Sequence, residues 1–259
     1  MSTQVAGRPS ALPASTPESA VVAEAAAPAA ARAKMSGTVA RLAQQGANAS
    51  VEVVVNTADA NALLQALERQ GLTVDDITTY AQLPMVALRV PAQQLDELAT
   101  LAQTSFISLN DTVEAASLGS ANARQANYVV SNVPSPTDPD AVIPNSNLGV
   151  AVLDSGVDRL MSWDLDSFVQ QINFVTAQCG NNWWEASYGC DPYGHGTHVA
   201  SLIVGDGTDS HGYYAGIGGP VKLYSLRVLD HKGRGKLSDT LAALDWVLTN
   251  GPANNIKIV

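Results

Sequence analysis

The sequence has few of the features that accompany binding to nucleic acid or insertion into a membrane. Its 259 residues include only 14 Lys and Arg against 24 Asp and Glu, which gives a formal net charge of −10. A phosphate-binding surface needs clustered Lys and Arg, and the sequence contains no such cluster. No run of about eighteen uncharged apolar residues occurs either. The sequence therefore predicts neither a nucleic-acid partner nor a membrane span.

Cysteine is also scarce, which limits both metal binding and cross-linking. The two cysteines, Cys179 and Cys190, lie in one short stretch that contains Trp and Gly. In an oxidising compartment they would close that stretch as a disulfide, and in a reducing compartment they would be two free thiols. Two sulfurs alone do not indicate a structural metal site, which usually takes four ligands.

Each of the two predicted folded parts is preceded by a segment of biased composition. Residues 1–48 are rich in Ala, Pro and Ser and are expected to be disordered, because they hold too little apolar bulk to offset ordering. Glu18 and Glu24 interrupt what would be the apolar part of a secretory signal. Residues 116–147 form a polar, Pro-containing linker, which is typical of sites of proteolytic maturation.

Residues 49–115 predict a small α+β sandwich. The run "VEVVV" indicates a strand, and Asp59 and Gly71 are placed to begin and end the helix that follows. Two strand-like runs, a helix that opens at Pro91 and a last strand complete the order β-α-β-β-α-β. That order is typical of a ferredoxin-like fold, which by itself implies no function.

Residues 148–259 predict a different, α/β class of fold. Apolar strands are expected at "LGVAVLD", "VKLYSLRVL" and "IKIV", and helices at "HVASLIVG" and "SDTLAALDWVLTNG". Strands that are apolar throughout and alternate with helices favour a parallel sheet with helices on both faces.

Two residues of the α/β part are candidates for catalysis. Asp154 ends the first strand, and ligands of a parallel sheet gather at the carboxyl ends of its strands. His195 stands between Gly194 and Gly196 at a helix start, where the positive end of the helix favours the neutral imidazole. The alternatives are an ordinary turn Asp and a helix-start His without a role.

A metal site is a weaker interpretation of the same motif. His195 and His198 are three residues apart, whereas the zinc-protease helix motif places its histidines four apart with a Glu beside the first. His211 could supply a third ligand, but no pattern selects it. We therefore expect no metal ligands among these histidines.

Together, "VAVLDSGVD" and "GHGTHVA" resemble the Asp and His motifs of the subtilisin-like serine peptidases, the subtilases. "YAGIGGPVKLYSLRVLD" is similar to the family stretch after the His helix, and residues 49–115 look like the family's propeptide, a folding aid and inhibitor. The resemblance implies that Asp154 holds the imidazole and that His195 takes a proton from a serine and returns it to the leaving amine. It gives His198 a structural role.

The resemblance extends to the segment "HKGRGKLSD", which is similar to the family's substrate-binding edge strand. Gly233 and Gly235 would leave room for a substrate strand that pairs through its backbone. Leu229 and Leu237 would line an apolar pocket a few residues before the scissile bond, or else be ordinary core. Peptide or protein substrates and the chain's own propeptide are the partners implied. No cofactor is required; structural calcium is compatible with the family, but no motif here indicates it.

The family's nucleophile motif, of the type Gly-Thr-Ser-Met-Ala, does not occur in the sequence. Ser155 only follows the Asp, and Ser201 lies inside the His helix. We therefore expect an N-terminal fragment of a serine endopeptidase zymogen, inactive as it stands, whose serine lies beyond this chain. An extracytoplasmic location is expected. The alternative is a non-catalytic protein, either a pseudoenzyme or a propeptide-type inhibitor of other peptidases.

Overall fold

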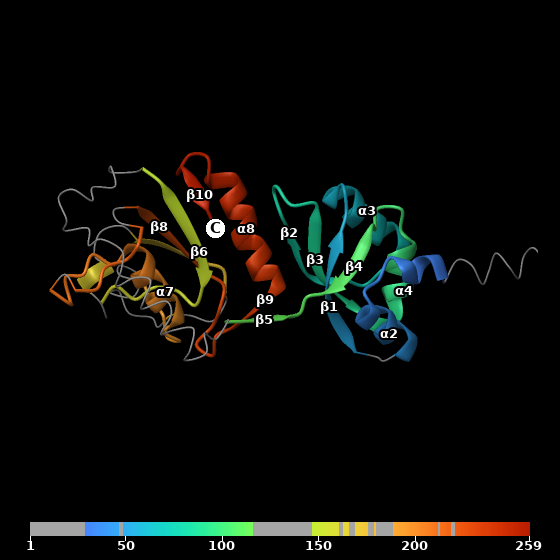
Figure 1. The fold of residues 1–259 in the computed structure, drawn as a ribbon. Helices are drawn as coiled ribbons and strands as arrows, with labels where there is room; N and C mark the ends of the chain where they lie inside the picture. Colours follow the sequence, from blue (N-terminus) through green and yellow to red (C-terminus); the bar gives the residue numbers. More distant parts are fainter. Residues whose placement is uncertain are drawn as a thin grey trace, which may run out of the picture.

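The computed structural model describes residues 29–46, 49–115, 147–160, 163–165, 169–175, 179, 189–211, 213–218 and 221–259. These residues form an N-terminal sandwich and an α/β region that lie side by side (Figure 1). No helix in the described part of the chain has the length and hydrophobicity needed to cross a membrane.

The sandwich has the predicted β-α-β-β-α-β order, preceded by a short helical segment at residues 29–33 and by helix α2. Its elements are α2 (Gly37–Gln45), β1 (Ser50–Asn56), α3 (Ala60–Gln70), β2 (Asp75–Thr79), β3 (Met85–Pro91), the short 3-10 turn η1 (Ala92–Gln94), α4 (Leu95–Thr100) and β4 (Phe106–Leu109). The sheet is antiparallel, in the order β2-β3-β1-β4. Asp59 caps α3 by accepting from Ala62 N, and Gly71 ends the helix in the left-handed conformation. Pro91 closes β3 and precedes the second helix, so it does not occupy a helical position.

The prediction that residues 1–48 are disordered is wrong for residues 29–46. Ala31, Met35 and Val39 are buried in the same cluster as the residues of α3 and α4. Ala31 lies in a short helical segment at residues 29–33, Met35 in an isolated parallel bridge with Ile107, and Val39 in α2. The three lie in different local structures, so they form no single periodic pattern, and composition averaged over the whole stretch hides them. Residues 1–28 lie outside the described part of the chain.

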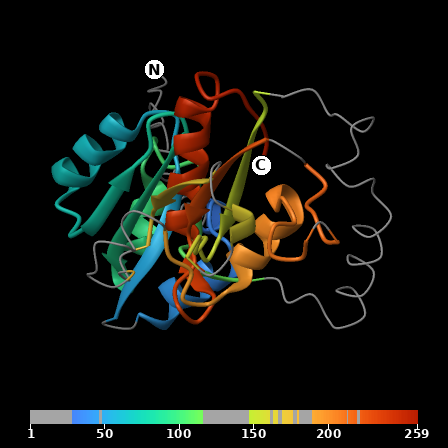
Figure 2. The ribbon, with the colours of Figure 1, turned by 90° about the vertical axis from the view of Figure 1, so that its left-hand side faces the viewer.

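The α/β region contains the predicted parallel sheet. Its elements are β6 (Gly149–Asp154), the 3-10 turn η2 (Trp163–Leu165), β7 (Val169–Asn173), α7 (His195–Val204), β8 (Lys222–Arg227), β9 (Arg234–Lys236), α8 (Leu237–Asn250) and β10 (Ile256–Ile258). The sheet order is β10-β6-β8-β7, with every pair parallel. Figure 2 shows α7 and α8 on opposite sides of β6.

Alternation along β6 explains this three-layer arrangement. Val150 packs in a cluster with Ala200 and Val204 of α7, whereas Ala151 packs in a cluster with Ala243 of α8. Successive side chains of a strand point to opposite faces, so a strand that is apolar at every position can be covered on both sides. The prediction of helices on both faces is confirmed.

The second face of the sandwich sheet packs on α8. Val54, Tyr80 and Ala87 of the sandwich form a cluster against which Leu237 and Leu241 of α8 pack. The Tyr80 hydroxyl donates to the carbonyl of Ser238 at 3.2 Å. Burial, together with the nearby Asp239 and Asp245, raises the pKa of Tyr80 to about 12, so the phenol keeps the proton that it donates.

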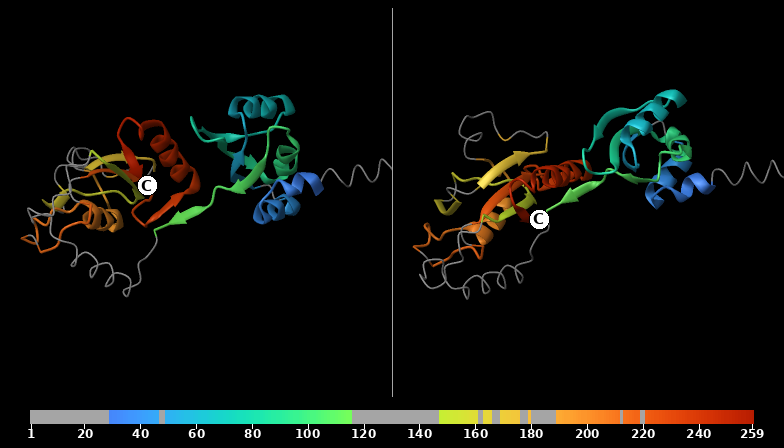
Figure 3. Two further views of the ribbon diagram at one scale, coloured as in Figure 1. Left: turned by 45° about the horizontal axis from the view of Figure 1, so that its top comes forward. Right: turned by 90° about the horizontal axis from the view of Figure 1, so that it is seen from above.

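A short strand joins the two regions a second time. Strand β5 (Thr112–Glu114) leaves the sandwich and extends to the α/β region, as Figure 3 shows, and there it pairs with β9 in antiparallel register. The sequence placed these residues inside the sandwich, but they belong to a two-stranded sheet on the α/β region. The predicted linker 116–147, with its maturation site, lies outside the described part of the chain except for Asn147.

Candidate catalytic site

Asp154 and His195 meet at the carboxyl edge of the parallel sheet. His195 Nδ1 lies 2.7 Å from Oδ2 and 2.9 Å from Oδ1 of Asp154, so the expected hydrogen bond is present. The two side chains are only 11% and 23% exposed, for Asp154 and His195 respectively. Because an ionised carboxylate can only accept, Nδ1 carries the proton and Nε2 of the neutral ring is the atom that can accept one.

Backbone hydrogen bonds hold both the carboxylate and the carbonyl group of Asp154. Ser155 N donates to Oδ1 at 2.6 Å. The Asp154 carbonyl accepts from Val228 N at 2.9 Å and from Leu229 N at 3.2 Å, where β8 ends beside β6. The acid therefore projects from the end of β6, which is hydrogen-bonded to the chain at the end of β8.

A side chain is disfavoured at each of the two glycines around His195, for a different physical reason. Gly194 has φ 89°, a left-handed conformation that side chains disfavour, and it precedes the first residue of α7. Gly196 lies so close to Gly156 that a Cβ at this position would be 2.1 Å from the Gly156 carbonyl oxygen. Gly196 N also donates to Ser155 Oγ at 3.0 Å. Close packing of α7 on the loop after Asp154 therefore brings the imidazole to the carboxylate.

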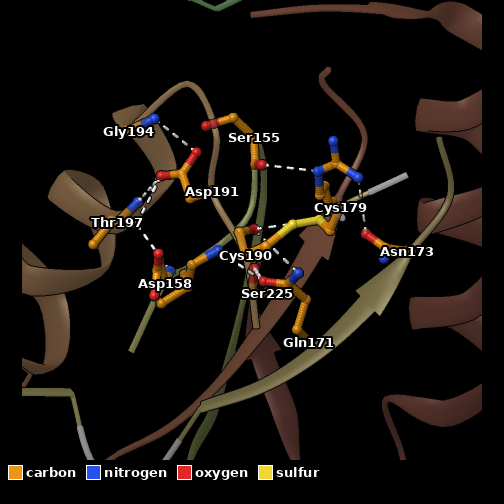
Figure 4. The surroundings of a disulfide bond; sticks show 12 residues. Ser155, Asp158, Gln171, Asn173, Cys179, Cys190, Asp191, Gly194, Thr197 and Ser225 are labelled. Atoms are coloured by element: carbon orange, nitrogen blue, oxygen red, sulfur yellow. Dashed lines mark hydrogen bonds between the residues drawn. A yellow bond between two sulfur atoms is a disulfide. The ribbon is translucent and has the colours of Figure 1, made fainter. Parts of the chain in front are cut away.

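The structure adds Asp191 to this site, which the sequence analysis missed. Its carboxylate accepts from Gly194 N at 2.8 Å and from both the backbone N and the hydroxyl of Thr197 at 2.7 Å (Figure 4). An Asp a few residues before a helical segment is a capping signal, and it stands in the motif "DPYGHGTHVA".

Arg227 is a second residue that the sequence analysis missed. Its side chain is fully buried, and Nε donates to the Ser155 carbonyl at 3.1 Å. Nη1 lies 3.4 Å from Oδ1 of Asn173. Burial lowers the pKa of the guanidinium, with Asp191 and Asp230 acting in the opposite direction. The cation supports the loop after Asp154 from inside the sheet. No signal marks it, because it continues an apolar strand.

Cys179 and Cys190 form a disulfide, as the sequence predicted for an oxidising compartment. Their Cα atoms are 5.8 Å apart, within the usual range for a bridge. The Cys190 carbonyl accepts from Gln171 Nε2 at 3.2 Å (Figure 4). The bridge therefore lies against strand β7, immediately before Asp191.

The predicted substrate-binding glycines lie at the edge strand β9. Their backbone is already hydrogen-bonded to the β5 segment. Gly235 pairs with Val113, and the carbonyl of Gly233 accepts from Ala115 N at 2.9 Å. A Cβ on Gly235 would be 2.0 Å from the Val228 carbonyl, so this glycine is also required by packing within the region. Gly233 has φ 70° and lies under the ring of Tyr193.

The structure does not bring the two predicted pocket leucines into one cluster. Leu229 is buried with Val113 and Ala115 of the β5 segment packed against its cluster. Leu237 instead packs in the cluster between α8 and the sandwich sheet. A pocket shared by both leucines stays a prediction.

In the described part of the chain, no third side chain joins His195 and His198 to form a metal site. His198 is exposed on α7, one turn beyond His195. Within the described ranges no three His, Cys, Asp or Glu side chains are grouped to hold a metal ion.

The site thus consists of an Asp–His pair at the carboxyl edge of a parallel sheet, next to the helix that begins with the His. Residues 145–259 match the sequence profile described as the Subtilase family. This part of the chain belongs to the subtilase family.

Several curated proteins are similar to the chain. The extracellular serine proteinase of Thermus sp. (strain Rt41A) is 30% identical over 191 residues, which cover 72% of this chain and 42% of the relative. Subtilisin DY of Bacillus licheniformis is 30% identical over 106 residues, covering 41% and 34%. The minor extracellular protease Epr of Bacillus subtilis is 28% identical over 111 residues, covering 42% and 15%. The chain therefore spans less than half the length of each of these relatives.

A solved structure supports the fold. The epidermin leader peptide processing serine protease (EpiP) of Staphylococcus aureus matches with a TM-score of 0.54 over 81% of this chain and 49% of that protein. The sequence identity is 18%, so this likeness concerns the fold alone.

Proposed function

We propose that the chain belongs to a serine endopeptidase zymogen, in which Asp154 and His195 are two members of the triad. A serine outside this sequence would supply the nucleophile. The observation that carries the proposal is the 2.7 Å hydrogen bond between His195 Nδ1 and Asp154 Oδ2. It fixes the tautomer in which Nε2 can act as the base.

The reaction follows from that geometry. His195 Nε2 takes the proton from the serine hydroxyl as its oxygen attacks the substrate carbonyl carbon, and the imidazolium is stabilised by Asp154. The same proton then passes to the leaving amine as the peptide C–N bond breaks. Water repeats both steps on the acyl-enzyme and releases the second product.

In this proposal the sandwich is an intramolecular propeptide that inhibits the peptidase. Three contacts support it: the β5–β9 pairing, the apolar cluster under α8, and the Asp245 carboxylate, which accepts from three consecutive backbone N–H groups. A peptide strand already lies along the edge where the family resemblance places the substrate. Removal of the sandwich would free that edge.

The occupied edge strand also suggests the kind of substrate. Val113 and Ala115 pack towards the cluster of Leu229, while Glu114 between them is exposed and paired with Arg234. We infer that substrates bind as extended chains with apolar side chains at alternate positions before the scissile bond. An extracytoplasmic location is proposed with it, because the disulfide needs an oxidising compartment.

The test is kinetic and uses the full-length protein after removal of the sandwich. His195→Ala should lower kcat by a factor on the order of 10⁶, the loss known for the same change in subtilisin, and Asp154→Asn by about 10⁴. His198→Ala is the matched control, because it changes an exposed histidine of the same helix. Loss of a structural role would lower stability, but kcat of the folded enzyme should be unchanged. A fluorophosphonate probe should label the wild-type protein.

Two outcomes would contradict the proposal. Hydrolysis that survives His195→Ala would assign the activity to another site. Absence of both hydrolysis and labelling in the full-length protein would favour the non-catalytic alternative, a pseudoenzyme or an inhibitor of other peptidases.

A further inference from the structure

The first turn of α7 needs acceptors that its own N-cap residue does not provide. The first N–H groups of a helix have no partner within the helix, and Gly194 at the N-cap has no side chain to offer. Asp191 fills this need from outside the helix: Oδ1 accepts from Gly194 N at 2.8 Å and Oδ2 from Thr197 N at 2.7 Å. The two acceptor oxygens bracket His195, which lies between the two donors.

The same turn is bonded to the loop that follows Asp154. Thr197 Oγ1 donates to Asp191 Oδ2 at 2.7 Å and accepts from Asp158 N at 3.0 Å. Asp191, Thr197 and Asp158 therefore form a continuous hydrogen-bonded connection between the chain before His195 and the chain after Asp154 (Figure 4). The imidazole itself is hydrogen-bonded to Asp154.

The disulfide holds the residue next to Asp191. Cys190 is 6% exposed, and its carbonyl oxygen would lie 2.1 Å from a Cβ built on Gly156. Gln171 of β7 links the same two segments, because its Nε2 donates to the Cys190 carbonyl and its Oε1 accepts from Val157 N at 2.7 Å. Cys190 is thus fixed between β7 and the Asp154 loop, and Asp191 follows it directly.

We propose that Asp191 is a positioning residue that holds His195 within hydrogen-bonding distance of Asp154, and that the Cys179–Cys190 disulfide restrains Asp191. Gly194 is left-handed and lacks a Cβ, so the backbone directly before His195 is not stiff by itself. The proposal deepens the proposed function, because its kinetic consequence rests on that function. Its geometric consequence does not.

The geometric test uses the chain as it stands and observes the His195 Nδ1 proton by NMR with ¹⁵N-labelled histidine. In the wild type this proton should give a resonance protected from solvent exchange by Asp154. Asp191→Ala should abolish that protection. Asp191→Asn should restore it in part, because the carboxamide oxygen can replace one of the two acceptors. Thr197→Val gives a second route if Asp191→Ala does not fold, because it removes the Oγ1 bonds and keeps the backbone N–H.

Asp59→Ala is the matched control for a general effect of losing a helix cap. Asp59 caps α3 through Ala62 N at 3.0 Å, in the sandwich and away from His195. This variant should leave the His195 resonance unchanged. The proposal is overturned if the folded Asp191→Ala and Thr197→Val proteins both keep the protected resonance, or if Asp59→Ala loses it equally.

The kinetic test uses the full-length peptidase. Asp191→Ala should lower kcat by about 10²-fold with a much smaller change in KM, since a displacement of about 1 Å at a catalytic group costs that much. If the wild-type full-length protein has no activity, the proposed function fails while the NMR measurement still decides the role of Asp191. An unchanged kcat in an active enzyme overturns the positioning role.

The disulfide is tested by Cys179→Ser with Cys190→Ser in one protein. This variant should reduce the protection of the His195 Nδ1 proton from solvent exchange and should lower kcat, both by less than Asp191→Ala does. Adding it to Asp191→Ala should cause little further loss, because both changes act on one connection. Full additivity would overturn the restraint of Asp191 by the disulfide.

Discussion

The sandwich and the α/β region use their buried positions differently. The sandwich buries one large apolar cluster under its helices and a small one against α8, and its buried polar side chains are the uncharged Thr57 and Thr104. The α/β region divides its apolar side chains between the two faces of its sheet and also buries Asp154, Ser155, Ser225 and Arg227. A buried polar group costs stability unless it is hydrogen-bonded. The region that carries the candidate site therefore gives up apolar burial to hold polar groups in place.

The largest effect that separates the two regions should come from matched core truncations. Leu98 and Leu223 are both fully buried, one in each region. Leu98→Ala should lower the unfolding free energy of the sandwich, and Leu223→Ala that of the α/β region, each by about 3 kcal/mol. All four tryptophans lie in the second region, at 163, 183, 184 and 246, so their fluorescence reports its unfolding separately from circular dichroism.

Urea titrations of both variants test this comparison. Leu98→Ala should shift part of the dichroism transition and leave the fluorescence midpoint near that of the wild type, whereas Leu223→Ala should shift the fluorescence midpoint. If each variant shifts both signals equally, the chain unfolds as one cooperative unit, and the two regions are not separate in stability.

The sequence predicted most of each region's elements because their periodic signals are local. The resemblance of "VAVLDSGVD" and "GHGTHVA" to the family's motifs, together with the strand-end and helix-start positions, predicted that Asp154 and His195 meet. Strand β7 was not predicted, because "VQQIN" has polar residues where its neighbours in the sheet are apolar. The β5–β9 pairing was missed as well, because register between segments distant in sequence depends on tertiary packing, which no short pattern encodes.

The docking of the sandwich on α8 should depend on Asp245. Its Oδ1 accepts from Gln82 N at 2.6 Å and Leu83 N at 3.0 Å, and its Oδ2 from Ala81 N at 2.9 Å. Asp245→Ala should weaken binding of an isolated 29–115 segment to the α/β region about tenfold, or about 1.4 kcal/mol. Calorimetric titration measures this. An unchanged affinity would mean that the apolar cluster alone holds the two regions together.

Low pH should weaken the docking of the sandwich on the α/β region, because it protonates Glu52. The bond from Lys236 lowers the pKa of Glu52, although partial burial acts against it. A lowered pKa means that the contribution is present above the ordinary carboxyl pKa, about 4.3, and is lost as the pH falls through the lowered value. Asp239 acts in the opposite direction, because burial raises its pKa and protonation relieves that cost.

Glu52→Gln separates these two contributions to docking. The variant should bind less tightly than the wild type at neutral pH by under about 1 kcal/mol, because the pair with Lys236 is partly exposed. As the pH falls below the lowered pKa of Glu52, the two affinities should converge. A wild-type affinity that rises steadily as the pH falls through this range would show that Asp239 outweighs Glu52.

The smallest effect is expected at the ion pair of Glu114 with Arg234, although it lies on the β5–β9 pairing itself. Both side chains are 61% exposed, and the two groups are 3.0 Å apart. Solvent screening and side-chain entropy leave such a pair worth about 0–0.5 kcal/mol, so Glu114→Gln should leave docking almost unchanged. The backbone bonds of β5 and the burial of Val113 are independent of this charge.

Val113→Ser is the matched comparison: it removes apolar burial from the same strand, keeps its backbone, and should weaken docking more than Glu114→Gln. The reverse order would mean that charge rather than strand pairing fixes β5 on the edge strand.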